Sequence, residues 1–245
     1  MADVKVWAHR GAGGWDKQYA PENTMPAFEK AIEMGADGIE LDVQFSKDGE
    51  IVICHDETID RTSNGVGAVR AYTLKELKQF NFCSVHPEFG FVESPTLREV
   101  LEFMQEKDFQ LNIELKTSNY DYPGLEEAAS KLVKEYGLND RVIYSSFGYA
   151  SLKKLRKCDK DAQIAILCST DFVLQEDVEV LQAIAIHPWE QLVTAERVKK
   201  WHEWGVKVNT WTVDNPQRMK EILTMDVDAM ITDCPDNGRR VASEM

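Results

Sequence analysis

Val4-Lys5-Val6-Trp7-Ala8 and Gly38-Ile39-Glu40-Leu41-Asp42-Val43-Gln44-Phe45 are two strand-like runs that enclose one amphipathic helical segment. The helix opens at Asn23-Thr24-Met25-Pro26, where either of the first two residues can cap it and the proline suits its first turn. Gly35 marks its end. A strand, a helix and a second strand in this order are typical of the parallel crossover unit of α/β proteins. The stretch 4–45 therefore predicts a parallel sheet with a covering helix.

The remainder of the chain repeats this unit. Strand candidates begin at eight positions in total, which are Val4, Gly38, Leu111, Val142, Ala162, Ala183, Val206 and Ala229. Helical stretches follow several of them, at Thr96-Leu97-Arg98-Glu99, Ala150–Lys157, near Asp171–Glu179, Thr194–Trp204 and Pro216–Leu223. An α/β barrel closes with eight strands and usually needs about 250 residues. The 245-residue chain is therefore predicted to be a single (β/α)8 TIM barrel over residues 1–245.

One segment interrupts the repeat between the second strand and the helix at Thr96. It contains a hairpin-like Lys47-Asp48-Gly49, an apolar run Ile51-Val52-Ile53 and a loop from Arg61 to Gly67. A segment of about fifty residues is too long for an ordinary connection in a compact barrel, and such insertions are usually functional. We expect a small inserted subdomain at about residues 46–94, lying over one face of the barrel.

The charge and composition exclude several classes of function. A formal net charge of −14 repels nucleic acid and anionic lipid, so neither a nucleic acid partner nor stable membrane association is expected. No apolar run approaches the ~20 residues that span a bilayer, and the N-terminus lacks a signal peptide pattern, so we expect a cytoplasmic location. Five cysteines without a C-x-x-C pair indicate neither a disulfide framework nor a thiolate zinc site. No pattern indicates an oligomeric state.

Polar residues gather at the carboxyl ends of the predicted strands, where barrel enzymes carry their reactive groups. The set comprises His9 with Arg10, Glu40 with Asp42, Glu114 with Lys116, and Asn209 with Trp211. Residues two apart on a strand share a face, so each acidic pair points one way. The intervening apolar residues face the other way into packing, and these are Ile39, Leu41, Ile113 and Leu115.

Three carboxylates, those of Glu40, Asp42 and Glu114, would then face one barrel mouth. Two like charges ~4 Å apart cost about 4 kcal/mol at an effective dielectric near 20. Such carboxylates are solvated or ion-paired at strand edges, or partly protonated, or ligands of a cation, and the neighbouring His-Arg pair favours a cation. Three hard oxygen ligands suit Mg²⁺ or Ca²⁺ rather than zinc or copper. We predict one divalent cation.

An ordered set of short motifs spans nearly the whole chain. It comprises His9-Arg10-Gly11, Pro21-Glu22-Asn23-Thr24, Glu40-Leu41-Asp42-Val43, Ser46-Lys47-Asp48-Gly49, His55-Asp56, Pro95-Thr96-Leu97, Glu114-Leu115-Lys116, Thr210-Trp211-Thr212-Val213-Asp214 and Ile231-Thr232-Asp233. Each fragment alone is a weak signal, but in this order they resemble the glycerophosphodiester phosphodiesterase family. One departure is the stretch 12–20, which is longer than in the leanest members.

The resemblance implies a (β/α)8 barrel with a subdomain inserted after its second strand. It also implies His9 and His55 as a catalytic pair and a divalent metal held by Glu40, Asp42 and Glu114. Arg10 and Lys116 would match phosphate-contacting positions. Because His55 lies in the insertion, it can meet His9 only if the insertion folds over the barrel mouth.

The activity implied by the resemblance is metal-dependent hydrolysis of a small-molecule glycerophosphodiester to glycerol 3-phosphate and an alcohol. The two histidines would act as general acid and base, since their ordinary pKa lies near neutrality. The glycerol 2-hydroxyl would attack phosphorus and leave a cyclic phosphate that is then opened. Trp211 either packs on the glycerol carbons or belongs to the core, and the sequence leaves both open. Of the remaining histidines, His187 lies at a strand end and the others are expected on the surface.

Two alternatives differ in substrate or in class. A related barrel lipase acting on intact phospholipid would require an exposed apolar or basic patch and usually a secretion signal, and the acidic charge argues against it. A barrel that only binds a phosphorylated metabolite would be favoured if a histidine or carboxylate of the set were replaced. All are present, so hydrolysis is the leading hypothesis.

Overall fold

The strands form one closed parallel barrel in a computed structural model that describes residues 4–13 and 19–244. They are β1 (Lys5–Ala8), β2 (Gly38–Phe45), β3 (Ile51–Ile53), β4 (Gln110–Leu115), β5 (Val142–Ser146), β6 (Gln163–Cys168), β7 (Ala185–Pro188), β8 (Lys207–Thr210) and β9 (Ala229–Thr232). All except β3 are parallel, and the sheet closes because β1 pairs with both β9 and β2. The prediction of a (β/α)8 barrel is confirmed. The strand predicted to begin at Val206 runs from Lys207 to Thr210.

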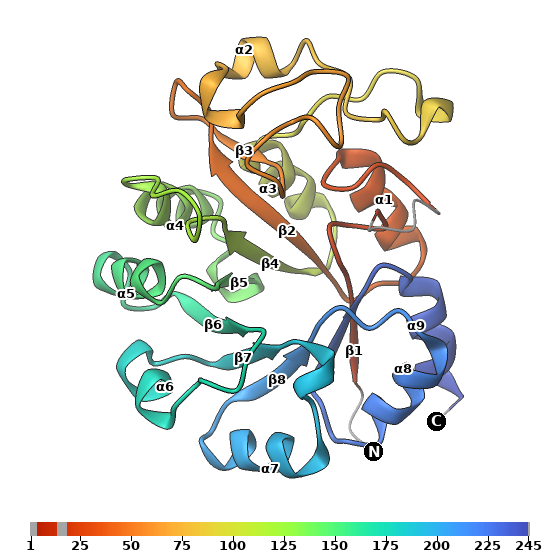
Figure 1. Ribbon diagram of the computed structural model, residues 1–245, viewed down its shortest axis with the longest axis vertical. Helices are drawn as coiled ribbons and strands as arrows, with labels where there is room; N and C mark the ends of the chain where they lie inside the picture. Colours follow the sequence, from red (N-terminus) through yellow and green to blue (C-terminus); the bar gives the residue numbers. More distant parts are fainter. Residues whose placement is uncertain (1–3, 14–18, 245) are drawn as a thin grey trace.

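Helices surround the barrel (Figure 1). They are α1 (Met25–Glu33), α3 (Leu97–Glu106), α4 (Leu125–Glu135), α5 (Tyr149–Cys158), α6 (Gln175–Leu181), α7 (Ala195–Glu203), α8 (Pro216–Leu223) and α9 (Pro235–Ser243), while α2 (Leu74–Leu77) lies in the segment between β2 and α3. The helix expected near Asp171–Glu179 begins only at Gln175, because the Asp177 carboxylate accepts the backbone N–H of Leu174 and fixes the first turn there. Within the described ranges, no helix combines the length and the apolar character needed to cross a membrane.

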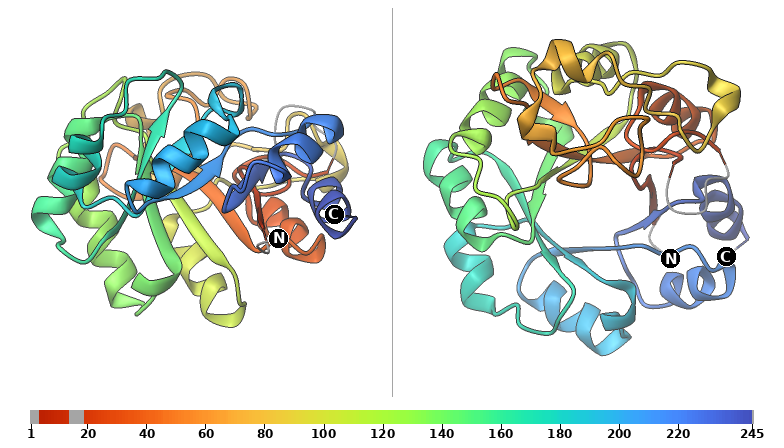
Figure 2. Two further views of the ribbon diagram at one scale, coloured as in Figure 1. Left: turned by 90° about the horizontal axis from the view of Figure 1, so that it is seen from below. Right: turned by 45° about the horizontal axis from the view of Figure 1, so that its top comes forward.

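The segment between β2 and α3 lies at the top of Figure 1 and at the rim of the barrel in Figure 2. Its strand β3 pairs antiparallel with the end of β2, so that Val43 lies opposite Ile53. Thr73 caps α2, and Glu76 returns a hydrogen bond to the Thr73 backbone. The segment has a small apolar core of its own, made of Val52, Cys54, Ile59, Val69, Leu77 and Phe82. This core holds the chain around His55 against the end of β2.

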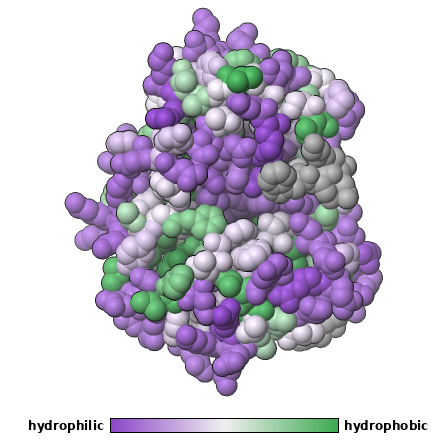
Figure 3. Space-filling view, viewed as in Figure 1, coloured by the Kyte–Doolittle hydropathy of each residue, from purple (hydrophilic) through white to green (hydrophobic). Residues whose placement is uncertain are grey.

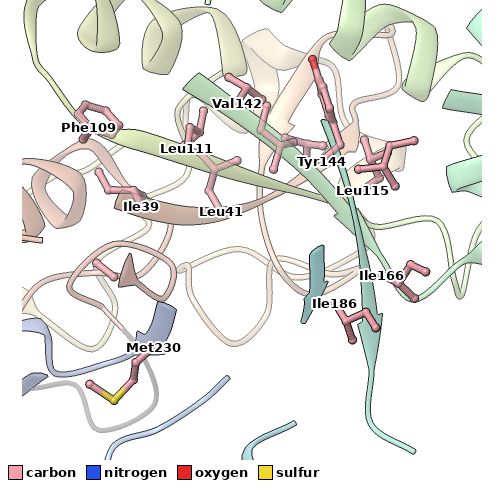
Figure 4. Packing of buried hydrophobic residues seen from close by; sticks show 14 of the residues in the cluster. Ile39, Leu41, Phe109, Leu111, Leu115, Val142, Tyr144, Ile166, Ile186 and Met230 are labelled. Carbon is pink, nitrogen blue, oxygen red and sulfur yellow. The ribbon is translucent and has the colours of Figure 1, made fainter. Parts of the chain in front are cut away.

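Apolar side chains on the outer faces of β2 and β4 pack against the helices (Figure 4). The predicted alternation is confirmed, because all of these side chains are fully buried in the main core: Ile39, Leu41, Ile113 and Leu115. The polar residues between them consequently point into the barrel. Parallel pairing places Glu40 beside Asn112 and Asp42 beside Glu114, which brings the acidic residues of two strands together.

Gly11 is required where the chain passes close to α1. Its φ is +76°, and an added Cβ would lie 2.8 Å from the Ala27 carbonyl carbon. Gly49 has a similar φ of +83° but open space around it. Gly11→Ala is therefore expected to lower the free energy of unfolding by about 2–4 kcal/mol, and Gly49→Ala by about 1–2 kcal/mol, since only the first adds overpacking to backbone strain. The free energies of unfolding are measured with urea. Equal losses in the two variants would show that the contact between the new Cβ at position 11 and Ala27 is relieved at little cost in free energy.

Candidate active site

A pocket of about 140 Å³ opens at the carboxyl ends of the barrel strands. Figure 3 shows a hollow in the middle of the view, with hydrophilic residues above it and hydrophobic residues at its lower left. The pocket is lined by His9, Arg10, Glu40, His55, Asn112, Glu114, Phe147, Leu167, Trp211, Thr212 and Ile231. The insertion and β1 thus bring His55 and His9 to one cavity. Asp42 and Lys116 lie behind this wall, in contact with residues that line it.

The carboxylates of Glu40, Asp42 and Glu114 are buried, and one oxygen of each lies within 4.8 Å of the others. Burial, followed by the charge of Asp42, raises the pKa of Glu40 to about 8. Burial also raises the pKa of Glu114, although Lys116 opposes it. The pKa of Asp42 is lowered in spite of burial, by His55, Lys116 and Arg10. Burial therefore opposes ionisation of Glu40 and Glu114, and a positive charge placed among the three groups would favour it.

Two buried oxygens beside this cluster lack a hydrogen-bond partner. They are Oδ1 of Asp42 and Oδ1 of Asn112, and both side chains are about 1% exposed. An unpaired buried oxygen costs free energy unless something satisfies it. A cation among the three carboxylates would do so, and the donor set is entirely oxygen. The residues present therefore fit a hard divalent cation. Asn112 was not identified from the sequence, although it precedes Glu114 by two residues on the same face.

His9 is oriented by a carboxylate from the far end of the chain. Its Nδ1 lies 2.6 Å from Oδ1 of Asp233, and its Nε2 lies 4.0 Å from Oε2 of Glu40. A proton on Nδ1 bound to Asp233 leaves Nε2 toward the pocket. Burial and Arg10 lower the pKa of His9, but Asp233 and Glu40 outweigh them, so that the pKa is raised overall. The Asp214 carboxylate accepts a hydrogen bond of 2.8 Å from the Asp233 backbone N–H, which holds the Asp233 backbone in place.

His55 has a matching carboxylate within the insertion. Its Nδ1 lies 2.6 Å from Oδ1 of Asp56. The two oxygens of Asp56 also accept hydrogen bonds from Nε and Nη2 of Arg61, at 2.7 and 3.1 Å. Although burial opposes it, His55 and Arg61 hold the pKa of Asp56 well below its usual range. Both pocket histidines thus carry an aspartate on Nδ1, and the Asp56 carboxylate is also bound by an arginine fork.

Glu22 connects this arrangement to the first strand. Its carboxylate accepts two hydrogen bonds from Arg61, at 2.5 and 2.8 Å, and one from Arg10 at 3.0 Å. Ion pairs and hydrogen bonds therefore connect five residues in succession: Arg10, Glu22, Arg61, Asp56 and His55. Charge-assisted and forked hydrogen bonds of this kind fix geometry more strongly than neutral ones. These ion pairs hold the insertion against the barrel, and they connect two residues that line the pocket, Arg10 and His55.

Arg10 and Lys116 place positive charge beside the carboxylates. Arg10 has a φ of +54°, and its backbone N–H donates to Glu40 at 2.9 Å. Nζ of Lys116 lies 3.0 Å from Glu114 and 3.6 Å from Asp42. Burial lowers the pKa of Lys116, but Asp42 and Glu114 raise it more, so the ammonium stays charged. In a chain of net charge −14, these two cations offset part of the negative charge of the carboxylates at the pocket.

An apolar wall faces the charged half of the pocket. The Trp211 indole donates a hydrogen bond of 2.7 Å to the His187 carbonyl, which fixes the ring. Its edge contacts Phe147, with ring centroids 5.5 Å apart. Leu167 and Ile231 complete this wall. Trp211 lines the pocket and also packs against a buried apolar cluster inside the barrel, so both positions left open for it stay open.

Several smaller predictions have different outcomes. Thr24, one of the two residues predicted to cap α1, occupies the cap position without a side-chain cap bond, and the Asn23 amide donates to Asp42 at 2.8 Å. His187 lies at the end of β7, as predicted; it is fully buried and does not line the pocket, and burial lowers its pKa to about 3. His86 is buried rather than exposed, because its ring packs on Phe89. Of the lengthened stretch 12–20, residues 14–18 lie outside the described part of the chain.

Comparison with known proteins agrees with this architecture. The model of the glycerophosphoryl diester phosphodiesterase family matches residues 9–237. The chain is 42% identical over 233 residues to a glycerophosphodiester phosphodiesterase of Caldanaerobacter subterraneus, with 94% of each chain covered. It is 41% identical to another of Bacillus altitudinis, with 99% of each covered.

A solved structure is similar over nearly the same length. It is a phosphodiesterase from Oleispira antarctica in complex with the product sn-glycerol-3-phosphate, with a TM-score of 0.88, 30% identity, and coverage of 98% of this chain and 96% of that one. The match of the family model to almost the whole barrel and the identity to full-length relatives lead to one conclusion. The chain belongs to the glycerophosphoryl diester phosphodiesterase family and is an enzyme of that class.

Proposed function

We propose that the protein hydrolyses glycerophosphodiesters to glycerol 3-phosphate and an alcohol, with a divalent cation bound by Glu40, Asp42 and Glu114. The observation that carries the proposal is one pocket lined by two aspartate-bound imidazoles, Arg10, Glu40 and Glu114, with Asp42 and Lys116 directly behind them. The product bound to the related Oleispira antarctica phosphodiesterase supports the choice of substrate.

A bound Mg²⁺ or Ca²⁺ would act as a Lewis acid on a phosphoryl oxygen. The residues of the chain supply the remaining functions. Arg10 and Lys116 bind the phosphate anion, with the planar guanidinium forming paired hydrogen bonds to its oxygens. The buried Oδ1 atoms of Asp42 and Asn112, which accept no hydrogen bond from the described residues, support cation binding at this cluster. Charge neutralisation of this kind is needed because the anionic oxygens of a phosphodiester repel a nucleophile.

The two histidines would transfer protons at their Nε2 atoms. We assign His9 as the acid for the departing alkoxide, because its raised pKa favours the protonated imidazole. His55, on the opposite element of the pocket, would take the proton of the attacking glycerol 2-hydroxyl, and water would then open the resulting cyclic phosphate to glycerol 3-phosphate. With Asp233→Asn, His9 loses the carboxylate that raises its pKa. We expect the alkaline limb of the pH profile to move to lower pH; an unchanged limb would contradict the assignment.

The activity is tested by incubating the protein with glycerophosphocholine or glycerophosphoglycerol and measuring release of glycerol 3-phosphate. The reaction is run with EDTA and again after adding Mg²⁺ or Ca²⁺. We expect turnover that EDTA abolishes and that one or both cations restore. Absence of turnover on every glycerophosphodiester and with either cation would instead favour a barrel that only binds a phosphorylated metabolite.

Arg61 is expected to matter for turnover although it does not line the pocket. Removing it in Arg61→Ala breaks the link between Arg10 and His55, so we expect kcat to fall about 10–100-fold, as for other residues that orient site groups. Lysine cannot form the fork, so Arg61→Lys should remain impaired, whereas free guanidinium should partly restore Arg61→Ala. Arg240→Ala, at an exposed arginine of α9, is the matched control. Full activity of Arg61→Ala would show that this connection is dispensable.

A further inference from the structure

A second cavity lies at the amino ends of the barrel strands, on the face opposite the reaction pocket. Its volume is about 530 Å³, compared with about 140 Å³ for that pocket, and it is in the size range of small-molecule sites. Residues at or just before the first positions of several strands line it, among them Lys5, Gln110, Arg141, Lys207 and Ala229. We call this space the amino-end cavity.

Small side chains inside the barrel leave room for the cavity. The apolar cluster in the barrel interior includes Ala165, Ala185 and Ala229, whereas such interiors are usually filled by bulky branched residues. Trp7 is the largest residue of this cluster, and it fits beside Gly38, where an added Cβ would lie 2.9 Å from the indole nitrogen. Because Trp7 and Ala229 also line the cavity, the cavity reaches into the barrel and is not confined to its surface.

The inner wall of the amino-end cavity contains a hydrogen-bond donor. Trp7 is 4% exposed, and its Nε1 donates no hydrogen bond to any residue that the structure describes. A buried donor without an acceptor costs free energy. This wall therefore favours a ligand that carries acceptor atoms.

Two of the three aspartates that line the cavity are bound by other groups of the chain. Asp37 lies 2.6 Å from Arg239 and 3.6 Å from Lys5. The Asp228 carboxylate accepts the Val208 backbone N–H at 2.8 Å, at the start of β8. Both carboxylates therefore already have donors or cations beside them.

Two cations at the cavity remain without such a partner. Arg141 donates to the carbonyls of Phe109 and Met104, at 3.0 and 3.1 Å, and Lys207 is exposed. Neither lies in an ion pair with a carboxylate of the described ranges, and Asp108, the third aspartate, is exposed to solvent. Four cationic and three acidic side chains give the cavity a net charge of +1, whereas the whole chain carries −14. An anion is therefore attracted here more than to the remainder of the surface.

We propose that the amino-end cavity is a second ligand site, which binds a small organic anion, either a carboxylate or a phosphate ester. Arg141 and Lys207 attract the anionic group, and Trp7, Phe109 and Ile143 contact the organic part. None of the described residues that line the cavity is a histidine, and the carboxylate cluster lies at the other end of the barrel. The bound anion is consequently a ligand that is not hydrolysed there.

The two cavities can be followed separately through their tryptophans. Trp7 lines the amino-end cavity and Trp211 lines the reaction pocket. The experiment records ¹H–¹⁵N spectra of the indole N–H groups in the metal-loaded protein, with Trp7→Phe and Trp211→Phe identifying the two signals. The probes are benzoate and phenyl phosphate, and benzamide is the matched neutral probe. We expect both anions to shift the Trp7 signal saturably and benzamide to bind at least about threefold more weakly, since an exposed ion pair changes affinity by up to about fivefold.

A charge variant assigns the shift to this cavity. Lys207→Gln should raise the Kd of benzoate about two- to fivefold. Lys75→Gln is the matched control and should leave it unchanged, because Lys75 is an exposed lysine of α2 in the insertion.

Three results would overturn the proposal. The first is that neither anion shifts the Trp7 signal, and the second is that benzamide binds as tightly as benzoate. The third is a Trp7 shift that follows the Trp211 shift and does not change in Lys207→Gln. The Trp7 ring contacts His187, with centroids 6.1 Å apart, and the His187 carbonyl holds Trp211, so that result would place the anion in the reaction pocket.

Discussion

Replacing His9 or His55 with alanine is expected to lower the turnover of glycerophosphocholine by about 10²–10⁴-fold in each case. Each imidazole lines the pocket and is held by an aspartate at 2.6 Å, so its loss removes an oriented proton donor or acceptor. The two histidines act in the same reaction, so either single change already removes most of the rate acceleration. The fold-loss of turnover in the double variant should therefore be much smaller than the product of the two single fold-losses.

The folded state should survive these substitutions. The His9 side chain is 12% exposed and that of His55 is 27% exposed, so neither leaves a large internal cavity. His202→Ala is the matched control, because His202 lies on α7, away from the pocket, where it pairs with Asp228. Turnover numbers are compared alongside thermal unfolding. Near-normal turnover in either His9→Ala or His55→Ala would remove that residue from the proton-transfer assignment.

Removing one ligand of the cation site is expected to have the second-largest effect. In Glu114→Gln the cluster keeps its shape but loses one negative charge. One charge at ~4 Å is worth about 4 kcal/mol at an effective dielectric near 20, so the cation concentration for half-maximal rate should rise about 10²–10³-fold. Titration of the metal-stripped variant with Mg²⁺ and with Ca²⁺ measures this. A change of less than about threefold for both cations would show that Glu114 is not a ligand.

Cation binding should also depend on pH in a definite direction. The pKa of Glu40 is raised from 4.5 to about 8 in the folded, metal-free protein. A carboxyl group whose pKa is higher in the folded than in the unfolded protein stabilises the folded state fully at a pH below its pKa in the unfolded protein. This stabilisation is lost as the pH rises through its pKa in the folded protein. The metal-free protein should therefore lose stability between about pH 4.5 and 8, and cation binding near neutrality should release protons.

Thermal unfolding of the metal-free protein across this range, with and without saturating Mg²⁺, measures the effect. The metal-loaded protein should become relatively more stable as the pH rises, because the cation stabilises the ionised carboxylates. Asp42 does not contribute in this window, since its pKa is lowered and its contribution is lost only in acid. Identical pH dependence with and without the cation would contradict the assignment of Glu40.

The alternation of side chains within a strand was predictable from the sequence. Glu40 and Asp42 had to share one face of β2 because the strand period is two, and the apolar residues between them had to pack outward. The register between strands was not predictable in the same way. Only the parallel pairing of β2 with β4 places Asn112 beside Glu40 and Glu114 beside Asp42, and nothing in either strand alone specifies that offset.

The pairing of the residues that orient the site was not predictable, for a different reason. Glu22, Asp56 and Asp233 lie within the family motifs, but with Arg61 they stand in polar loops or at element ends, where charged residues are common. Their roles follow from partners distant in sequence: Glu22 and Arg61 are 39 residues apart, and His9 and Asp233 are 224 apart. Local periodicity cannot reveal such pairs. The sequence therefore identified most charged groups at the pocket but not the ion pairs that hold them.

The hydrogen bond between His9 and Asp233 has a consequence for how the protein is made. Asp233 is translated after every other residue discussed for the pocket, and the histidine that it orients emerges among the first. A nascent chain on the ribosome can fold its early strands and helices while the final strand is still unavailable to close the barrel. During that interval His9 has no carboxylate on Nδ1. The newborn protein should therefore acquire its hydrolytic competence in one late step, when β9 inserts between β8 and β1.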